Sequence, residues 1–387
     1  MRSVTLLSIC LALVMLFGSV LTGCSQPTPA PSPAPSAAPA MKPAPAASPS
    51  PAPSPAAKTA AWPKEINIAT KPMPATTYVI AVAISKMVTK YLKDVNVNVK
   101  TFPGTVDWPD REEKGELDIT MQTASTAYLA TVGEDTFKEH GPYNMWAGGF
   151  GPVAYEGIIA RKGSGIKTPA DLKGKKLMVL RPGSDLMTRV KDAWLRAYNL
   201  PEKDVTILSH ASTTEFVEAV KEGRVDAIAW PCYAASPWAT ELAQGGNIEF
   251  ISDTPEAIKK ITEELYPGLF IPTTMPANTY KGQDKPWVTA GAVTMFSIRD
   301  GLSEDFVYEL AKVLWGNFDE WAGYHSDVEG YRLPGSVNPD SMIIPLHPGI
   351  VKYLKEKGYW KPEQEAKRNA VLAKMQKARE AFKAQKK

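Results

Sequence analysis

Four loops place small polar side chains at the starts of helical patterns, where an anion binds most readily. They span residues 70–78, 122–128, 181–188 and 231–238. Free backbone N–H groups and the dipole at a helix start favour an anion by about 0.3 to 2 kcal/mol. The hydroxyls of Thr76, Ser125 and Ser184 are also typical helix N-caps, and capping alone explains each of them equally well.

The fourth loop is crowded with aromatic residues: Trp230, Tyr233 and Trp238. Such rings can stack on a ligand, and Arg181 in the third loop is available to pair bidentately with a carboxylate. Core packing is the alternative for each tryptophan. It is the preferred interpretation of Trp230, which ends an expected strand.

The sequence shows no catalytic constellation. A nucleophilic Cys232 would need a base beside it, and the four histidines form no Cys/His signature with it, so a small buried thiol is the favoured interpretation. No histidine pair has metal-ligand spacing, and no P-loop or dinucleotide motif occurs. Gly148, Gly149 and Gly151 are expected to form a turn. We therefore expect a protein that is not an enzyme, with no metal and no cofactor.

Strands and helices alternate through the region that carries these loops. Apolar side chains at Ile80, Ile84, Met87 and Val88 follow helical spacing after the first strand. The expected strands are residues 65–70, 95–100, 117–121, 176–180, 205–209 and 225–230. Helices are expected over residues 184–198 and 213–222. This alternation predicts an α/β fold, whose ligand loops lie at the carboxyl ends of the strands.

The pattern occurs twice, which suggests two similar halves. The strand and loop from residue 66 match those from residue 177, and "GELD" at 115–118 matches "GRVD" at 223–226 at a nearly equal offset. Chance similarity between α/β segments is the alternative. Extended residues 153–165 suit a crossover between the two lobes, and a strand from Ala292 is expected to return to the first lobe.

The N-terminus reads as an export signal. An apolar stretch without charge runs from Ser3 to Gly23, long enough that an uncleaved membrane helix is the alternative. Residues 21–24, "LTGC", resemble the lipobox of bacterial lipoproteins, which implies cleavage before Cys24 and lipidation of its thiol. Several acyl chains on one residue hold a membrane far more firmly than one.

Residues 26–57 alternate proline with alanine and serine, a composition that forms no core and favours extended polyproline II. We expect a tether that holds the folded part away from the membrane. The net charge of the whole chain is only +3, with acids and bases interspersed, which argues against nucleic-acid binding. Cys232 has no intramolecular disulfide partner after cleavage and lipidation, and a monomer is expected.

Several segments together resemble the TAXI family of solute-binding proteins, in the family's order over residues 65–360. The more specific segments are "YKGQDKPW" (280–287) and "LHPGIVKYLKEKG" (346–358), supported by "TPADLKGKKL", "PGS" and "VKEGRVDAIAW". The resemblance implies a two-lobed type II periplasmic-binding-protein fold, with a mixed sheet flanked by helices in each lobe. It also implies capture of a small solute outside the cell for a tripartite ATP-independent periplasmic (TRAP) permease.

Combining the resemblance with the loops, we expect a small, anionic organic ligand. The expected ligand residues are Thr76, Thr77, Tyr78, Gln122, Ser125, Arg181, Gly183, Ser184, Tyr233 and Trp238. Three departures from the family weaken the transfer of its ligands: Lys71, Pro72 and Pro74 replace glycines, Ser125 stands near an expected aspartate, and Asp185 adds a carboxylate at a helix start. We expect Arg181 to offset Asp185.

The expected organisation begins with a signal peptide and a tether and continues with two lobes and a basic tail. Its segments are 1–23 (signal), 24–61 (anchor and tether), 62–155 (first lobe), 156–275 (second lobe), 276–360 (return to the first lobe) and 361–387 (basic helical tail). The tail is expected to dock on a lobe, with contact to lipid or permease as the alternative. A sensory lipoprotein that signals to a membrane kinase, and a transferase on a related fold, remain alternative functions.

Overall fold

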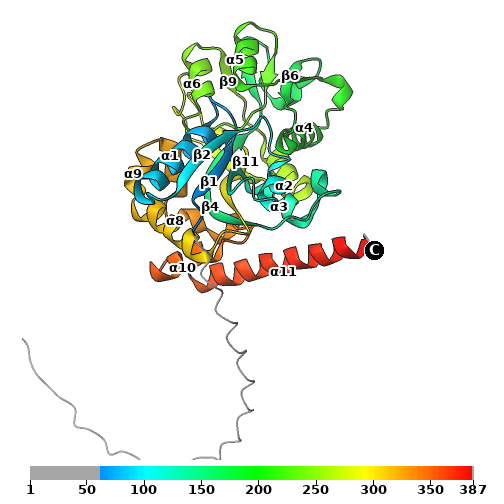
Figure 1. The fold of residues 1–387 in the computed structure, drawn as a ribbon. Helices are drawn as coiled ribbons and strands as arrows, with labels where there is room; N and C mark the ends of the chain where they lie inside the picture. The colour runs from blue at the N-terminus through cyan, green and yellow to red at the C-terminus, as the bar shows by residue number, and fades with distance from the viewer. Residues whose placement is uncertain (1–61, 386–387) are drawn as a thin grey trace, which may run out of the picture. The chain divides into compact units, whose positions relative to one another are not determined.

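The computed structural model describes residues 62–385, which form two α/β lobes, each built around its own sheet (Figure 1). The expected signal peptide, Cys24 and the tether lie outside the described residues. Among residues 62–385, no helix is both long enough and apolar enough to cross a bilayer.

The first sheet has the strand order β10-β11-β3-β1-β2, and β4 also pairs with β11. Its strands are β1 (Glu65–Thr70), β2 (Asn96–Thr101), β3 (Ile119–Thr123), β4 (Met145–Glu156), β10 (Ile271–Met275) and β11 (Trp287–Arg299). Helices α1 (Thr76–Tyr91), α2 (Trp108–Glu113) and α3 (Ala124–Val132) follow its parallel strands. The apolar stripe predicted for α1 is confirmed, since Ile80, Ile84, Met87 and Val88 are all buried.

The second sheet has the order β7-β6-β8-β5-β9. Its strands are β5 (Ile159–Arg161), β6 (Lys176–Leu180), β7 (Thr206–Ser209), β8 (Ala227–Ile228) and β9 (Ile248–Phe250). The flanking helices are α4 (Asp185–Ala197), α5 (Thr213–Lys221), α6 (Pro237–Gln244) and α7 (Pro255–Lys259), which continues into a π-helical turn, Lys260–Leu265. The strand expected over residues 225–230 is shorter than predicted.

The two sheets repeat one arrangement. In the first, β1 pairs in parallel with β2 and with β3; in the second, β6 pairs in parallel with β7 and with β8. In both sheets, the first of these three strands therefore lies between the other two. This agrees with the internal similarity seen in the sequence.

Two long strands, β4 and β11, join the lobes. The N-terminal part of β11 places Trp287, Ala290 and Ala292 in the core of the second lobe. Its C-terminal part places Met295 and Phe296 in the core of the first. The β4 and β11 pairing shifts register between Val293 and Ser297, where the strands pass from one core to the other. The expected crossover segment, residues 153–165, begins in β4, and the strand expected from Ala292 lies in β11.

The turn expected at Gly148, Gly149 and Gly151 is wrong, because all three lie within β4. A Cβ on Gly148 would lie 1.9 Å from the ring of Phe296, and one on Gly151 would lie 2.2 Å from the ring of Tyr331. These glycines let large aromatic rings lie flat on the strand, rather than letting the chain reverse.

The C-terminal part of the chain covers the first lobe. It contains α8 (Glu304–Gly316), α9 (Phe318–Ala322), α10 (Pro348–Glu356) and α11 (Pro362–Gln385). Short 3₁₀ segments occur at Asp135–Phe137, Pro169–Leu172, Glu202–Asp204, Ser326–Tyr331, Gly335–Val337 and Pro339–Ser341.

Helix α11 runs along the base of the first lobe, where it contacts α3 and the 3₁₀ turn Pro339–Ser341 (Figure 1). Arg368 Nε donates to the carbonyl of Leu346 at 3.0 Å, and Arg379 Nη2 donates to that of Tyr143 at 3.1 Å. The basic tail is therefore a helix docked on the first lobe, as predicted.

Candidate functional site

The two lobes close on a small cavity at the carboxyl ends of their parallel strands. Its volume is about 20 Å³, room for about one water molecule. It is lined by Lys71, Thr77, Thr105, Met121, Gln122, Thr123 and Thr126 from the first lobe and by Leu186, Pro231 and Tyr233 from the second. An organic solute is larger than this space, so binding it requires the lobes to separate.

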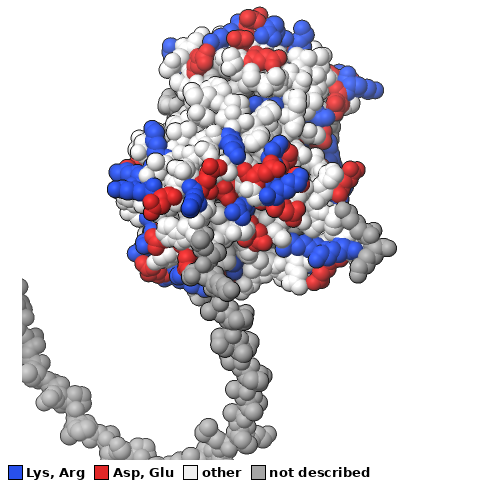
Figure 2. All heavy atoms as spheres, in the orientation of Figure 1, with Lys and Arg blue, Asp and Glu red and all other residues white. Residues whose placement is uncertain are grey.

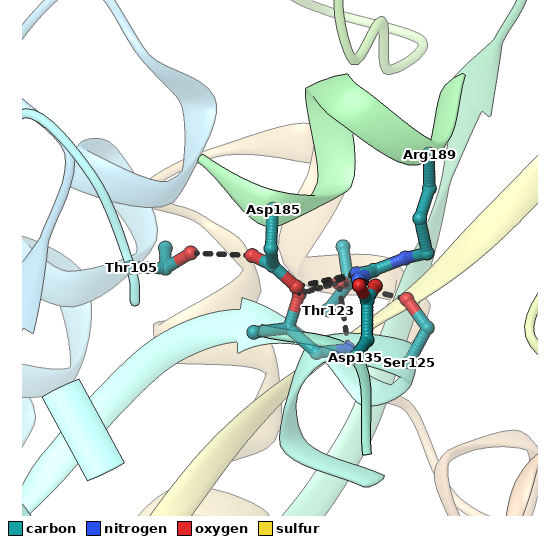
Figure 3. A network of polar contacts seen from close by, with 7 residues as sticks. Thr105, Thr123, Ser125, Asp135, Asp185 and Arg189 are labelled. Atoms are coloured by element: carbon teal, nitrogen blue, oxygen red, sulfur yellow. Dashed lines mark hydrogen bonds and ion pairs between the residues drawn. The ribbon is translucent and has the colours of Figure 1, made fainter. Parts of the chain in front are cut away.

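A carboxylate of the second lobe holds the first lobe in place (Figure 3). Asp185 begins α4 and is 2% exposed. Thr105 Oγ1 donates to Asp185 Oδ1 at 3.2 Å, and Thr126 Oγ1 donates to Asp185 Oδ2 at 2.9 Å. Both threonines belong to the first lobe. We call Asp185, Arg189, Thr105 and Thr126 the interlobe clasp.

Arg189 completes the clasp from the next turn of α4. Its Nη2 lies 2.5 Å from Asp185 Oδ2, and its Nη1 lies 3.0 Å from Oδ2 of Asp135 in the first lobe. The expectation that Arg181 offsets the charge of Asp185 is wrong, because Arg189 is the ion-pair partner of Asp185. Asp185 and Arg189 are four residues apart on α4, so their side chains lie on the same face of the helix.

Two glycines allow the lobes to touch through their backbones. The carbonyl oxygen of Gly183 accepts from the N–H groups of Thr105 at 2.9 Å and Val106 at 3.2 Å. A Cβ on Gly104 would lie only 2.2 Å from that oxygen, and Gly183 has φ of +71°. A side chain at either position would force the lobes apart or strain the loop.

Two cations in the cleft lack an acidic partner. The guanidinium of Arg181 lies 5.2 Å from the ring centre of Trp230, and the ammonium of Lys71 lies 5.1 Å from the same ring. Arg181 is 3% exposed, yet none of its three guanidinium nitrogens has a hydrogen-bond partner among the described residues. Neither cation forms an ion pair with a described residue. Trp230 lies in the core of the second lobe, which is the interpretation that the sequence favours. Both cations also lie over its ring.

The environment of these cations changes their titration. Burial, and then the positive charge of Arg181, lower the pKa of Lys71 to about 8, against the opposing effect of Glu156 and Asp185. Burial also lowers the pKa of Arg181. The cleft therefore holds positive charge that nearby acids do not neutralise, which is costly unless an anion enters.

The hydroxyls expected either to bind or to cap helices do not cap them. Helix α1 is preceded by Ala75, and α3 is capped by the side chain of Thr123 rather than by Ser125. Ser184 precedes α4, but its hydroxyl accepts no capping hydrogen bond. The hydroxyls of Ser184 and Thr77 are buried without any partner among the described residues. Capping alone therefore does not explain these residues.

The remaining predicted ligand residues divide into those beside the cavity and those away from it. Thr76 Oγ1 lies 3.3 Å from Ser236 Oγ across the cleft, and Ser125 Oγ lies 3.1 Å from Thr123 Oγ1. Gln122 and Tyr233 line the cavity, and Tyr233 Oη lies 2.9 Å from Thr294 Oγ1.

Of the predicted ligand residues, Thr77, Gln122 and Tyr233 are among those that line the cavity, and seven are not: Thr76, Tyr78, Ser125, Arg181, Gly183, Ser184 and Trp238. Tyr78 is half-buried on α1 and is not among the lining residues. Trp238 packs in the core of the second lobe, with its ring centre 5.1 Å from that of Phe216. Core packing is therefore the better interpretation of Trp238.

Cys232 has the environment of a structural thiol. Its side chain is fully buried, and burial raises its pKa far above the usual range. A nucleophilic cysteine needs the opposite shift. The described residues contain no group of three or more His, Cys, Asp or Glu arranged to hold a metal ion.

The outer surface contrasts with the cleft. On the face shown in Figure 2, acidic and basic side chains alternate over both lobes without gathering into a field of one sign. Long-range electrostatic attraction of a charged solute by that face is therefore weak. The uncompensated positive charge of Arg181 and Lys71 lies in the cleft between the lobes.

Comparison with known proteins places this cleft in a family. A family model described as NMT1-like matches residues 68–358. The chain belongs to the NMT1-like family. The match spans both lobes and every loop of the cleft, whereas the docked helix α11 lies beyond it.

Solved structures with a similar fold are binding proteins. PhnD1 from Prochlorococcus marinus (MIT 9301), in complex with methylphosphonate, matches with 12% identity and a TM-score of 0.50, covering 77% of this chain and 100% of that chain. The alkanesulfonate-binding protein SsuA from Xanthomonas axonopodis pv. citri, bound to MOPS, matches with 17% identity and a TM-score of 0.43, covering 81% and 94%. Periplasmic SsuA from Escherichia coli matches with 15% identity and a TM-score of 0.42, covering 84% and 93%.

At these identities the likeness shows the fold, and the predicted two-lobed periplasmic-binding-protein fold is confirmed. The chain is similar to periplasmic binding proteins for small solutes.

Several residues that shape the cleft were not among the predicted ligand residues. Lys71 was noted only as a glycine replacement, and Glu156, Thr105 and Thr126 were not singled out. The i, i+4 spacing of Asp185 and Arg189 was a usable signal for their pairing. No local signal marks Glu156, because its burial depends on how the crossover strand meets both lobes.

Proposed function

We propose that this protein is an extracytoplasmic receptor that binds a small anionic organic solute between its lobes and delivers it to a TRAP permease. The observation that carries the proposal is Arg181, a buried guanidinium with three unpartnered nitrogens at the edge of the cleft. A planar fork of N–H donors matches a carboxylate, phosphonate or sulfonate.

The surrounding groups support an anion at this position. Lys71 adds a second cation beside the same tryptophan ring, and the unpartnered hydroxyls of Thr77 and Ser184 add donors. The two latter residues lie at the starts of α1 and α4, where backbone N–H groups also point outward. The phosphonate and sulfonate named for PhnD1 and SsuA are anions of the same kind.

The delivery step rests on the TAXI resemblance, and the lipid anchor on the predicted lipidation of Cys24. We expect residues 24–61 to act as a tether between the anchor and a permease. The proposed solute contacts both lobes, because Arg181 belongs to the second and Lys71 and Thr77 to the first. A ligand shifts the open and closed populations only through such differential contacts.

Thermal unfolding of the purified protein against carboxylates, 2-oxo acids, phosphonates and sulfonates tests the binding step. A ligand at 100 times its dissociation constant adds about 2.7 kcal/mol and raises the midpoint by several degrees. Arg181→Met should abolish the shift. Arg224→Met, which removes a surface arginine of the same lobe, is the matched control.

Prior denaturation and refolding removes any copurified solute. If no anion raises the unfolding midpoint of the refolded protein, or if Arg181→Met leaves that rise unchanged, the proposed binding mode is wrong. Uptake of the identified solute by cells lacking this protein then tests delivery. TRAP transport should stop when the ion gradient is dissipated and should continue when ATP alone is depleted.

A further inference from the structure

Glu156 presents a buried carboxyl group with no partner. It is the last residue of β4, at the crossover between the lobes, and it is 0% exposed. Neither side-chain oxygen has a hydrogen-bond partner among the described residues. An isolated buried carboxyl group is costly, so its presence at a crossover calls for a reason.

Its position points to the cleft rather than to the core of the second lobe. The side chain of the preceding residue, Tyr155, packs against Trp287 in that core, with ring centres 6.2 Å apart. Successive side chains on a strand point to opposite faces, so Glu156 faces away from Trp287. Burial has the largest effect on the pKa of Lys71 and of Tyr233, and an ionised Glu156 would raise both; both of these residues line the interlobe cavity.

Nearby cations do not supply the missing partner. Arg189 is engaged by Asp185 and Asp135, and Lys71 lies over Trp230. Neither forms an ion pair with Glu156 among the described residues. Their positive charges lower the pKa of Glu156, but burial has the larger effect and raises it well above the usual range.

The chemistry of the missing partner follows in either protonation state. An ionised carboxylate offers only acceptors, and a protonated carboxyl group keeps an acceptor oxygen beside its O–H. Glu156 therefore needs a donor in both states. Arg181 and Lys71, which need an acceptor, lie in the same cleft, so the site is complementary to a molecule carrying both kinds of group.

We propose that Glu156 accepts a hydrogen bond from an amino or hydroxyl group of the solute, and that the solute is an anion carrying such a donor. The inference rests on the proposed function, because Arg181 and Lys71 must hold the anionic end. It assigns Glu156 as a specificity-determining residue. A plain alkyl anion would leave the carboxyl group buried and unpaired in the closed complex, and the site would discriminate against it.

Matched probe pairs test the inference on the refolded full-length protein by isothermal titration calorimetry. Each pair keeps the anionic head group and replaces the amino group by a methyl group: taurine against propanesulfonate, 2-aminoethylphosphonate against propylphosphonate, and 3-aminopropanoate against butyrate. Isethionate supplies a hydroxyl member. In at least one class the member with the donor should bind at least about tenfold more tightly.

Two variants of Glu156 test whether this residue causes the preference for the probe that carries a donor. Glu156→Leu should reduce it to less than about threefold, because no acceptor remains, while the alkyl anion still binds. Glu156→Gln keeps an amide oxygen and should preserve the preference for the hydroxyl member. Glu218→Leu, on the exposed face of α5, is the matched control and should bind as the unaltered protein does.

The outcomes separate the two proposals. If alkyl anions bind as tightly as their amino or hydroxyl partners, or if the preference survives in Glu156→Leu, the role of Glu156 is refuted while anion binding stands. If no probe of any class binds, anion binding fails, and the inference that rests on it fails as well.

Discussion

Removing the charge of Asp185 should open the lobes rather than unfold the protein. In the closed form Asp185 accepts from Thr105 and Thr126 and pairs with Arg189, and its carboxylate and the guanidinium of Arg189 are 0% and 3% exposed. Asp185→Asn keeps the shape but removes the charge, so Arg189 stays buried with only the half-exposed Asp135 as a partner.

The size of the expected change in lobe closure follows from the burial of the Asp185–Arg189 ion pair. Breaking a buried ion pair by removing one partner costs about 3 to 5 kcal/mol while the remaining charge stays buried. Separation of the lobes relieves this cost, because Arg189 then becomes hydrated. At about 1.4 kcal/mol per factor of ten, the ratio of closed to open protein should fall by about 10² to 10⁴.

Two assays detect this change. Small-angle scattering of the ligand-free protein should show a larger radius of gyration for Asp185→Asn than for the unaltered protein. Binding of the identified solute should strengthen, since the closed form excludes the solute and apparent affinity rises with the fraction of open, binding-competent protein. Association should become faster, because the solute no longer waits for the lobes to separate.

Asp192→Asn is the matched control, since it makes the same chemical change on the same helix at a carboxylate that is 40% exposed. It should leave scattering and affinity unchanged. If Asp185→Asn behaves like this control in both assays, the clasp does not govern closure and the reasoning from burial is refuted.

Three further predictions concern the cleft and its scaffold. Arg181→Met should stabilise the ligand-free protein by about 1 to 3 kcal/mol in denaturant unfolding, because it removes an unpaired buried charge; loss of stability would contradict this interpretation. Anion affinity should be flat below pH 7 and fall above pH 8, by up to about tenfold per pH unit, because Lys71, with a pKa of about 8, loses its proton there. In calorimetry, Lys71→Met should bind the anion more weakly than the unaltered protein, and its affinity should not fall above pH 8. If the variant and the unaltered protein show the same dependence of affinity on pH, Lys71 is not the group responsible. Gly148→Ala should cost about 1 to 3 kcal/mol because its Cβ would meet Phe296, whereas Gly316→Ala, in open space, should cost nothing.

Much of the fold could be predicted because local patterns determine it. The apolar spacing in α1 and the repeated strand, loop and helix units gave the two halves and the return of β11. The glycines of β4 were misassigned because their reason is not local. Gly148 and Gly151 make room for Phe296 and Tyr331, residues far away in the sequence.

The cleft was predicted at the level of loops, and less well at the level of side chains. Thr77, Gln122 and Tyr233 line the cavity as expected, because strand ends and helix starts can be located from the sequence. The partners of Asp185 and the isolation of Arg181 depend on how the lobes meet. Pairing across two lobes has no signature in either one alone.

The cleft contains two groups of buried polar side chains with opposite properties. In the interlobe clasp Asp185 has donors from both lobes and Arg189 has acceptors from both, and Nε of Arg189 is the one atom of these two side chains that is buried without a partner among the described residues. The second group, Arg181 and Glu156, has unpartnered atoms of both kinds in the same closed form. The clasp therefore favours closure without a solute, and the second group opposes it.

These opposing contributions set the conditions for a selective receptor. A solute that fills only the cationic end still leaves Glu156 unpaired, and a solute that satisfies both ends removes the whole penalty of closing. The difference between them is expressed in closure itself, because the cavity forms only when the lobes meet. Discrimination at Glu156 and closure at Asp185 should thus be separable. Asp185→Asn should raise the affinity for both members of a matched pair by the same factor, and Glu156→Leu should change mainly the ratio of the two affinities.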